Sequence, residues 1–319
     1  MAATSVHCAF DAVFLAAFGG PTPGCCKQAE PCPGEARCFV EDVLGRNPAR
    51  AARVEEVTAH YAHLGGFSPF NRHTDGQVAA LGAALRERGI DVPVRAGYRH
   101  WRPYIRDGIA ALASEGARRV LAVVLAPHQS SISWDWYLKV VAESLDPLGK
   151  KAPEVAYLDP WWAQEGFVEA CAGRVREALA GWPAARSEKA ELIFTAHAIP
   201  SAIARTSPYE RQFRETSEAV ARRLARPFSV AYQSGPDEPT IPWTGPDICD
   251  VMRERARPGR DFVLAPVGFL VDNVEILYDL DVAARREAES RGAGFVRAGA
   301  VGTHPAFIGM LADRIAARA

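Results

Sequence analysis

Eight short apolar runs, separated by longer amphipathic segments, are the feature that most restricts the fold of this 319-residue chain. Their apolarity is continuous rather than alternating, which is typical of strands that are buried on both faces. Such strands occur in parallel sheets that are covered by helices. The expected strands span 12–18, 92–98, 119–126, 154–158, 191–196, 228–233, 261–267 and 294–299.

Helical patterns fill most of the intervals between these strands. The expected helices span 74–89, 103–115, 162–181, 207–225 and 303–318. In the second half, strands begin roughly 35 residues apart, the usual length of a βαβ unit. We therefore favour two four-stranded halves over one closed barrel. The sequence predicts an α/β protein with domains over 1–160 and 161–319, the last helix being a candidate to pack on the first domain.

The composition is that of an ordinary globular chain, with 48% hydrophobic and 24% charged residues. A net charge of −1 excludes a broad electrostatic attraction to nucleic acid. No stretch approaches the roughly 18 consecutive apolar residues of a membrane span, and the first residues lack a basic leader. We expect a soluble cytoplasmic protein without a transmembrane segment or a nucleic-acid partner, and favour a monomer over a dimer.

Ligands of open parallel sheets bind beyond the carboxyl ends of the strands, so the residues there are the candidates for a site. His197 follows the strand at 191–196. A histidine in that place can act as a general base near neutral pH. The alternative from position alone is a core histidine that is bonded to a loop carbonyl.

Three acids follow the strand at 261–267, in the stretch "GFLVDNVEILYDLD". Asp272 and Glu275 fit a capping box, with Asp272 at the N-cap and Glu275 at the third helical position. Asp279 lies one turn further along, where no capping role explains it. Helix capping therefore accounts for two of the three acids.

Polar and aromatic residues also follow two strands of the first half. Arg99, His100 and Trp101 come after 92–98, and the stretch "PHQSSISWDWY" comes after 119–126. Together they would suit a flat, aromatic, anionic ligand, although each tryptophan alone is more often a packing residue.

Four cysteines lie within fourteen residues of the loop after the first strand: Cys25, Cys26, Cys32 and Cys38. Their thiolates could hold zinc or an iron–sulfur cluster, although the spacing fits no standard template. Free thiols or a redox pair are the alternative.

Several of these stretches, in order along nearly the whole chain, resemble the ferrochelatases. The stretches "FTAHAIP" and "PVGFLVDNVEILYDLD" are similar to the family's active-site histidine region and its "GF-x-SDH-x-ETLYELD" signature. Other landmarks of the family are matched by "AAFGGPTP", "HLGGFSPFNRHT", "GYRHWRPYI", "LAPHQSS" and "AYQSGP…PWTGPD".

The chain departs from the family pattern at several positions. Val271, Asp272 and Asn273 stand where the family has Ser-Asp-His, and Asp279 replaces a later Glu. Phe18 precedes the Gly-Gly of the first loop, where members often carry Met or Tyr, and phenylalanine cannot ligate a metal. The Arg99-His100 pair matches the soluble bacterial type, in which the histidine lies near the metal.

The resemblance implies two Rossmann-like domains of the class II chelatase type, with an active-site lip loop at about 20–45, and insertion of Fe²⁺ into a porphyrin (protoporphyrin IX or coproporphyrin III) in haem biosynthesis. His197 and Glu275 would be catalytic, and the metal would meet His197, Glu275, Asp279 and His100. The expected porphyrin-binding residues are Phe18, Phe67, Ser68, Phe70, Asn71, Arg99, Trp101, Ser130 and Trp134.

Two other functions fit the same residues. One is a cobalt or nickel chelatase that acts on a sirohydrochlorin-type ring. The other is a non-catalytic protein that binds porphyrin or haem, which Asn273 and Phe18 suggest.

Overall fold

The computed structural model describes residues 9–24, 32–236 and 239–319, and it contains the eight expected strands. They form two four-stranded parallel sheets, ordered β2-β1-β3-β4 and β6-β5-β7-β8. The predicted fold class is therefore confirmed. The strands are β1 (Ala12–Ala17), β2 (Val94–Tyr98), β3 (Arg119–Val124), β4 (Glu154–Tyr157), β5 (Glu191–His197), β6 (Phe228–Gln233), β7 (Asp261–Ala265) and β8 (Gly294–Arg297).

The chain divides into two compact units, each with one of the sheets. Unit 1 comprises Met1–Ala126, Ser133–Pro160 and Thr303–Ala319, and unit 2 comprises Pro127–Ile132 and Trp161–Gly302. Relative to the predicted ranges, a short segment after β3 belongs to the second unit and the last helix belongs to the first.

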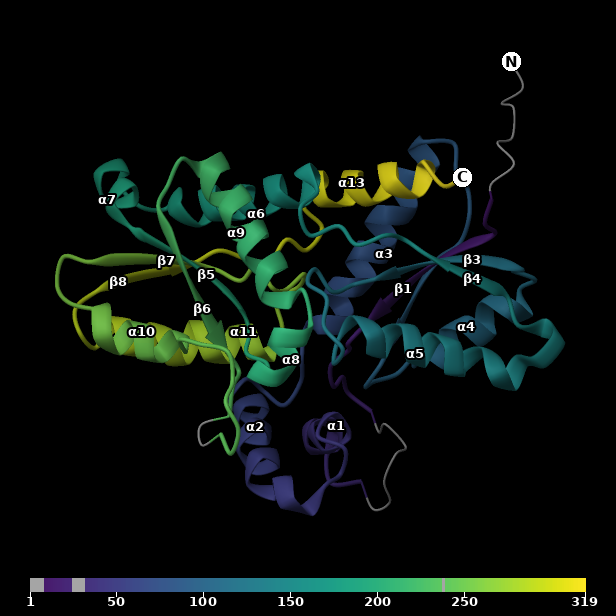
Figure 1. Cartoon of the computed structure of the whole chain (residues 1–319), viewed down its shortest axis with the longest axis horizontal. Helices are drawn as coiled ribbons and strands as arrows, with labels where there is room; N and C mark the ends of the chain where they lie inside the picture. The colour runs from purple at the N-terminus through teal and green to yellow at the C-terminus, as the bar shows by residue number, and fades with distance from the viewer. Residues whose placement is uncertain (1–8, 25–31, 237–238) are drawn as a thin grey trace. The chain divides into compact units, whose positions relative to one another are not determined.

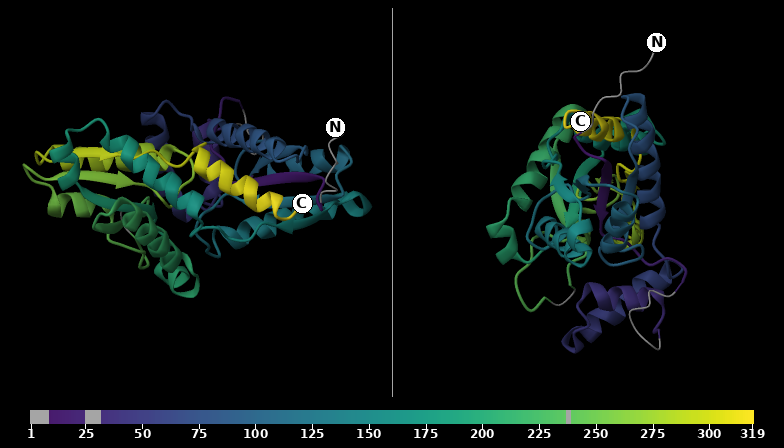
Figure 2. Two further views of the ribbon diagram at one scale, coloured as in Figure 1. Left: turned by 90° about the horizontal axis from the view of Figure 1, so that it is seen from above. Right: turned by 90° about the vertical axis from the view of Figure 1, so that its right-hand side faces the viewer.

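In unit 1, helices cover both faces of the sheet. Helices α4 and α5 pack on the face that carries Phe14 and Ala16. Helices α3 and α13 pack against each other on the other side, although they lie far apart in sequence (Figure 1 and Figure 2). The helices of this unit are α1 (Glu35–Val43), η1 (Pro48–Arg50), α2 (Ala51–His63), α3 (Phe70–Glu87), α4 (Ile105–Ser114), α5 (Trp134–Leu145), η2 (Asp146–Lys151) and α13 (Pro305–Ala316).

Unit 2 has the same two-sided construction. One face of its sheet packs on α10, α11, η3 and α12, and α6 and α9 lie on the other (Figure 1). Its helices are α6 (Glu165–Leu179), α7 (Ala184–Lys189), α8 (Ser201–Thr206), α9 (Tyr209–Leu224), α10 (Ile248–Arg255), α11 (Val274–Tyr278), η3 (Asp279–Ala284) and α12 (Arg285–Glu289).

Strand burial follows position in the sheet. Every residue of β1 is buried, and so are all residues of β3 and β7 except the first. The edge strands β4 and β8 are only partly buried. The continuous apolar pattern of the central strands therefore has the predicted cause, because helices cover both of their faces.

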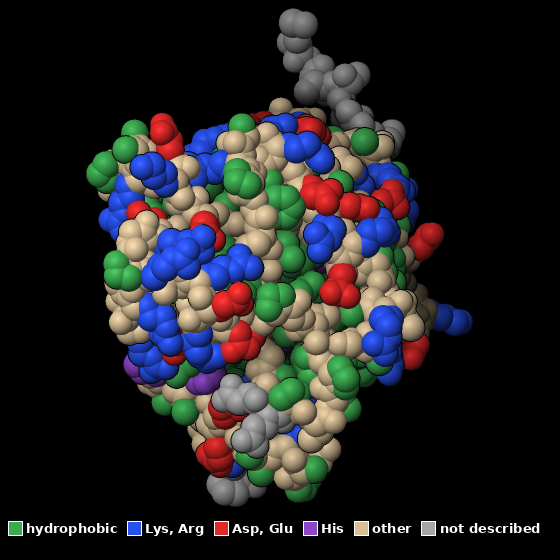
Figure 3. Space-filling view, turned by 60° about the vertical axis from the view of Figure 1, so that its left-hand side comes forward, with side chains coloured by type: hydrophobic (Ala, Val, Ile, Leu, Met, Phe, Trp, Pro, Cys, Tyr) green, Lys and Arg blue, Asp and Glu red, His purple; other side chains and the backbone are tan. Residues whose placement is uncertain are grey.

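No helix within the described part of the chain is long and apolar enough to cross a membrane. Charged side chains of both signs spread over the face shown in Figure 3, as a net charge of −1 would allow.

The loop after β7 passes very close to the end of β5. The Gly268 amide donates to the Thr195 carbonyl at 3.0 Å. A Cβ atom at Gly268 would lie 2.6 Å from the Cα atom of Ala196, closer than real side chains approach backbone. Only glycine lets this loop cross the strand at such a distance.

We expect Gly268→Ala to destabilise the protein by about 1–3 kcal/mol, because the added methyl group must push the loop off the strand. The measurement is the midpoint of urea unfolding. Gly181→Ala is the matched control in the same unit, since a Cβ there meets open space. Equal midpoints for the two variants would contradict the inference that only glycine fits at position 268.

Candidate active site

His197, the last residue of β5, presents one ring nitrogen to a backbone carbonyl and the other to an acid. Its Nδ1 atom is hydrogen-bonded to the Ala198 carbonyl oxygen. Because a carbonyl only accepts, Nδ1 carries the proton and Nε2 keeps a lone pair in the neutral ring. The Tyr209 hydroxyl donates to the His197 carbonyl at 2.8 Å and holds the main chain. This is the tautomer that a general base needs.

Glu275 faces that free nitrogen. Its Oε1 atom lies 3.7 Å from His197 Nε2, and the two side chains are 33% and 37% exposed. Asp279 follows one turn later, as the first residue of the π-helix η3, and accepts a hydrogen bond from the Ser234 hydroxyl. His197 and Glu275 therefore face each other, and Asp279 lies one helical turn beyond Glu275 in the chain.

His128 is a core histidine of this protein, and it can be compared with His197. It is 2% exposed, and its Nε2 atom is 3.1 Å from the Thr216 hydroxyl. Burial lowers the pKa of His128 to about 3, so the ring stays neutral at physiological pH. His197 differs from it in exposure and in having an acidic neighbour.

The predicted capping box of Asp272 and Glu275 is wrong. The N-cap of α11 is Asn273, whose side-chain oxygen accepts from the Ile276 amide at 3.2 Å. Glu275 is thus the second helical residue, and its carboxylate has no capping role. Asn273, which replaces the family's histidine, has a structural role of its own.

Asp272 is instead held by a buried arginine on the neighbouring strand β8. Arg297 donates to Asp272 Oδ1 at 3.0 Å and to Asp281 Oδ2 at 2.7 Å, and only 10% of its side chain is exposed. Asp272 also accepts from the Ala300 amide at 3.0 Å. This clamp attaches both ends of the α11 segment to the sheet.

In unit 1, His100 forms a second histidine–carboxylate pair. Its Nδ1 atom is 2.8 Å from Oδ2 of Asp42, which comes from α1, and the buried Nε2 atom has no hydrogen-bond partner among the described residues. Burial, assisted by the Arg99 charge, lowers the pKa of His100 although Asp42 acts in the opposite direction. Asp42 was not predicted as a site residue, because no local sequence pattern connects it to a histidine on another element.

The aromatic residues predicted to bind porphyrin differ in how far their side chains are exposed to solvent. Phe18 is partly buried, with its ring centroid 4.7 Å from that of His100, and Phe67 is 38% exposed. Trp101 and Trp134 are 1% and 5% exposed, and the Trp101 indole donates to Thr22 at 2.8 Å. The burial of both rings favours core packing over contact with a porphyrin, and the assignment of these two tryptophans stays a prediction.

Among the predicted polar contacts, Ser68 and Asn71 hold the first loop. The Asn71 side-chain oxygen accepts from the Gly20 amide at 3.0 Å, and the Ser68 amide donates to the Pro21 carbonyl at 2.9 Å. Both side chains are buried, as is that of Ser130 in unit 2. Their burial favours a structural role over the predicted contact with propionates.

Arg99 has a different environment from these buried polar residues. Its guanidinium lies 4.9 Å from the ring centroid of Trp136, and the Lys139 ammonium lies 4.4 Å from the same ring. Trp136 is 37% exposed. An exposed aromatic ring with two cations beside it suits an anionic aromatic ligand better than Trp134 does. No local pattern in the sequence distinguishes the two tryptophans.

Comparison with known proteins places the chain in a family. The family model described as ferrochelatase matches residues 11–319. The chain belongs to the ferrochelatase family. It is therefore an enzyme of metal insertion into porphyrin, the iron-inserting step of haem biosynthesis.

Individual relatives agree with the family assignment. The chain is 39% identical to the coproporphyrin III ferrochelatase of Propionibacterium freudenreichii, over 97% of this chain and 87% of the relative. It is 34% identical to the ferrochelatase of Rhodopirellula baltica, over 97% and 86%. Among solved structures, SirB from Bacillus subtilis with Fe³⁺ covers 95% of this chain and 93% of its own, with a TM-score of 0.57 and 13% identity. The last likeness is one of fold alone.

The cysteine loop of this ferrochelatase is described only in part. Cys25 and Cys26 lie outside the described residues, Cys32 is an exposed free thiol, and Cys38 is buried and disulfide-bonded. A disulfide sulfur is no thiolate ligand, so the state of Cys38 argues against the four-cysteine cluster. Within the described segments, no group of three or more histidine, cysteine or acidic residues is placed to hold a metal ion.

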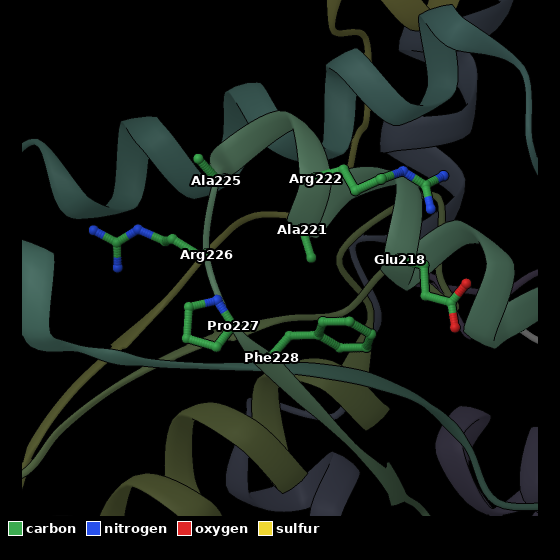
Figure 4. A pocket seen from close by; sticks show the side chains of 7 residues that line it. All are labelled: Glu218, Ala221, Arg222, Ala225, Arg226, Pro227 and Phe228. Atoms are coloured by element: carbon green, nitrogen blue, oxygen red, sulfur yellow. The ribbon is translucent and has the colours of Figure 1, made fainter.

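A surface pocket of 520 Å³ in unit 2 lies away from the candidate active site of the ferrochelatase. It is lined at the start of β6 by Phe228 and on α9 by Glu218 and Arg222 (Figure 4). Phe228 pairs with Leu192, whereas Gln233 pairs with His197 at the other end of the same strands. The pocket and the acids are therefore at opposite edges of the sheet.

We expect Arg297→Met to cost the ferrochelatase roughly 3 kcal/mol of stability, because two partly buried carboxylates lose their common cation. Urea unfolding followed by circular dichroism is the measurement. Arg186→Met is the control, since Arg186 also binds both oxygens of one aspartate, Asp261, but is exposed. Its midpoint should change little, and an equal loss in both variants would mean that burial of the clamp is unimportant.

Proposed function

We propose that this ferrochelatase inserts Fe²⁺ into coproporphyrin III. The observation that carries the chemistry is the His197–Glu275 pair, with Nδ1 fixed by a carbonyl and Nε2 facing the acid at 3.7 Å. The choice of ring is supported by the relative that is 39% identical and named for coproporphyrin III.

Metal insertion needs groups that remove protons from the pyrrole nitrogens. Two N–H protons leave the macrocycle and one Fe²⁺ takes their place, so the charge of the porphyrin core is conserved. His197 Nε2 accepts a proton from a pyrrole nitrogen and, once charged, is stabilised by Glu275 at 3.7 Å. Glu275 and then Asp279 receive the protons in turn, which returns His197 to its neutral form.

The same residues suit the metal as a substrate. Imidazole nitrogen and carboxylate oxygen are both acceptable ligands for ferrous iron. His197, Glu275 and Asp279 would contact Fe²⁺ for a short time on its way to the ring. In unit 1, His100 would offer its Nε2 lone pair, because Asp42 holds the other nitrogen.

For the porphyrin we propose contacts from residues that remain accessible in unit 1. These are Phe18, Phe67 and Phe70 as apolar walls, and Arg99 with the neighbouring Trp136 for the anionic periphery. Coproporphyrin carries more carboxylates than protoporphyrin, so cations at the periphery favour it.

The test of the proposed function is an anaerobic insertion assay with Fe²⁺ that offers coproporphyrin III and protoporphyrin IX separately. We expect kcat/KM for coproporphyrin to be higher by at least about tenfold, which corresponds to roughly 1.4 kcal/mol of discrimination. A preference for protoporphyrin would overturn the choice of ring. Tight porphyrin binding without turnover would indicate a carrier protein, and faster insertion of Co²⁺ or Ni²⁺ into sirohydrochlorin would indicate the other chelatase activity.

Substitutions in the histidine–acid pair test the proposed mechanism. His197→Ala should reduce kcat by about 10²–10⁴, the usual contribution of a general base. Glu275→Gln should reduce kcat by at least about tenfold while the unfolding midpoint stays unchanged, because the carboxylate caps nothing.

Glu218→Gln is the matched control for the acid, since Glu218 lies on α9 beside the pocket at the opposite sheet edge. It should keep wild-type turnover. Normal turnover in Glu275→Gln, or the same loss in both acid variants, would remove Glu275 from the mechanism.

A further inference from the structure

Two consecutive residues at the end of β6 contact both acids of the proposed proton path, and neither was predicted as a site residue. Gln233 is the last residue of the strand and is completely buried. Ser234 follows it in a left-handed backbone conformation, with φ at 64°. Both residues belong to unit 2, together with His197 and Glu275.

The Gln233 side chain joins the histidine strand to the acid helix. Its amide oxygen accepts from the Thr195 hydroxyl at 2.8 Å, and its amide nitrogen donates to the Glu275 carbonyl at 3.1 Å. The Gln233 carbonyl accepts from the Ala198 amide at 2.7 Å. Gln233 is therefore hydrogen-bonded to Thr195 and Ala198, which lie on either side of His197 in the chain. It is also bonded to the backbone of Glu275.

The Glu275 carbonyl is shared between Gln233 and the next acid. It accepts from the Asp279 amide inside the helix as well as from the Gln233 side chain. Helix α11 continues without a break into η3 and α12, and the Gln233 amide is bonded to its second residue. The Gln233 amide thus limits how far the helix can slide relative to β5, and with it the separation of Glu275 from His197.

Ser234 fixes the second acid directly. Its hydroxyl donates to Asp279 Oδ2. A left-handed conformation is unfavourable for serine and natural for glycine, so glycine would form this turn with less strain. Glycine, however, has no hydroxyl group, and therefore could not donate the hydrogen bond to Asp279.

We propose that Gln233 and Ser234 are positioning residues for metal insertion: Gln233 sets the gap between His197 and Glu275, and Ser234 aims the carboxylate of Asp279. The proposal rests on the proposed function. Displacement of a catalytic group by about 1 Å can reduce a rate by roughly 10²-fold, so positions enforced in this way matter for turnover.

The first test replaces Gln233 by methionine, which keeps the length of the side chain and removes its hydrogen bonds. We expect kcat to fall by at least about tenfold while KM for the porphyrin changes less than about threefold, because binding groups are untouched. Gln212→Met is the matched control in unit 2, since it removes two hydrogen bonds from another buried glutamine without contacting Glu275. Unchanged kcat in Gln233→Met, or an equal loss in both variants, would overturn the proposal.

A readout that needs no turnover is the crystal structure of Gln233→Met. The distance from His197 Nε2 to Glu275 Oε1 should increase beyond its present 3.7 Å. An unchanged distance would refute the positioning role of Gln233, even if the wild-type protein proved inactive in the insertion assay. Failure of the proposed function and failure of this proposal are therefore distinguishable.

The second test separates the hydroxyl of Ser234 from the strain at its backbone. Ser234→Ala and Ser234→Gly both remove the hydroxyl, but only glycine relieves the strain. We expect both variants to lose kcat to the same extent, by about threefold or more, while the glycine variant unfolds at higher urea concentration. If the glycine variant instead kept wild-type kcat, stability would explain the alanine result and the hydroxyl would have no positioning role.

Discussion

The parallel pairing of β5 with β6 on one side and β7 on the other is the constraint on which the site depends. Parallel strands in register end at the same edge of a sheet, so His197 and Gln233 lie opposite each other. The loop after β7 then crosses the end of β5 at Gly268 and leads into the helix that carries Glu275. Residues distant in sequence meet because the sheet gives them one common edge.

The three acids at and before the start of α11 are tolerated because each has a different partner. Carboxylates four residues apart repel each other by only about 0.2–0.5 kcal/mol on an exposed helix. Asp272 is paired with Arg297, Asp279 accepts from Ser234, and Glu275 faces His197. Asp272 and Asp279 are thus bound to other residues of the fold, whereas the Glu275 carboxylate remains available to His197.

The sequence predicted the strands and the place of His197 well. Continuous apolar runs indicated the strands, and the position of His197 after such a run indicated its place at the sheet edge. Local patterns misled where two interpretations share one motif. Asp272 and Glu275 have the spacing of a capping box, but Asn273 is the residue whose side chain accepts from the helix. A buried arginine on β8, which no local pattern connects to Asp272, takes that acid instead.

The sequence by itself determined the α/β class, the family and the histidine and acids of the candidate site, because these depend on residue type and on periodicity along the chain. Only the tertiary structure decided which side chains remain accessible. Trp134 is covered by core packing and Trp136 is exposed, although they are two residues apart. Only the tertiary structure also connected Asp42 to His100 and Gln233 to Glu275. Contacts of this kind depend on how separate elements pack, and packing brings together residues whose spacing in sequence carries no signal.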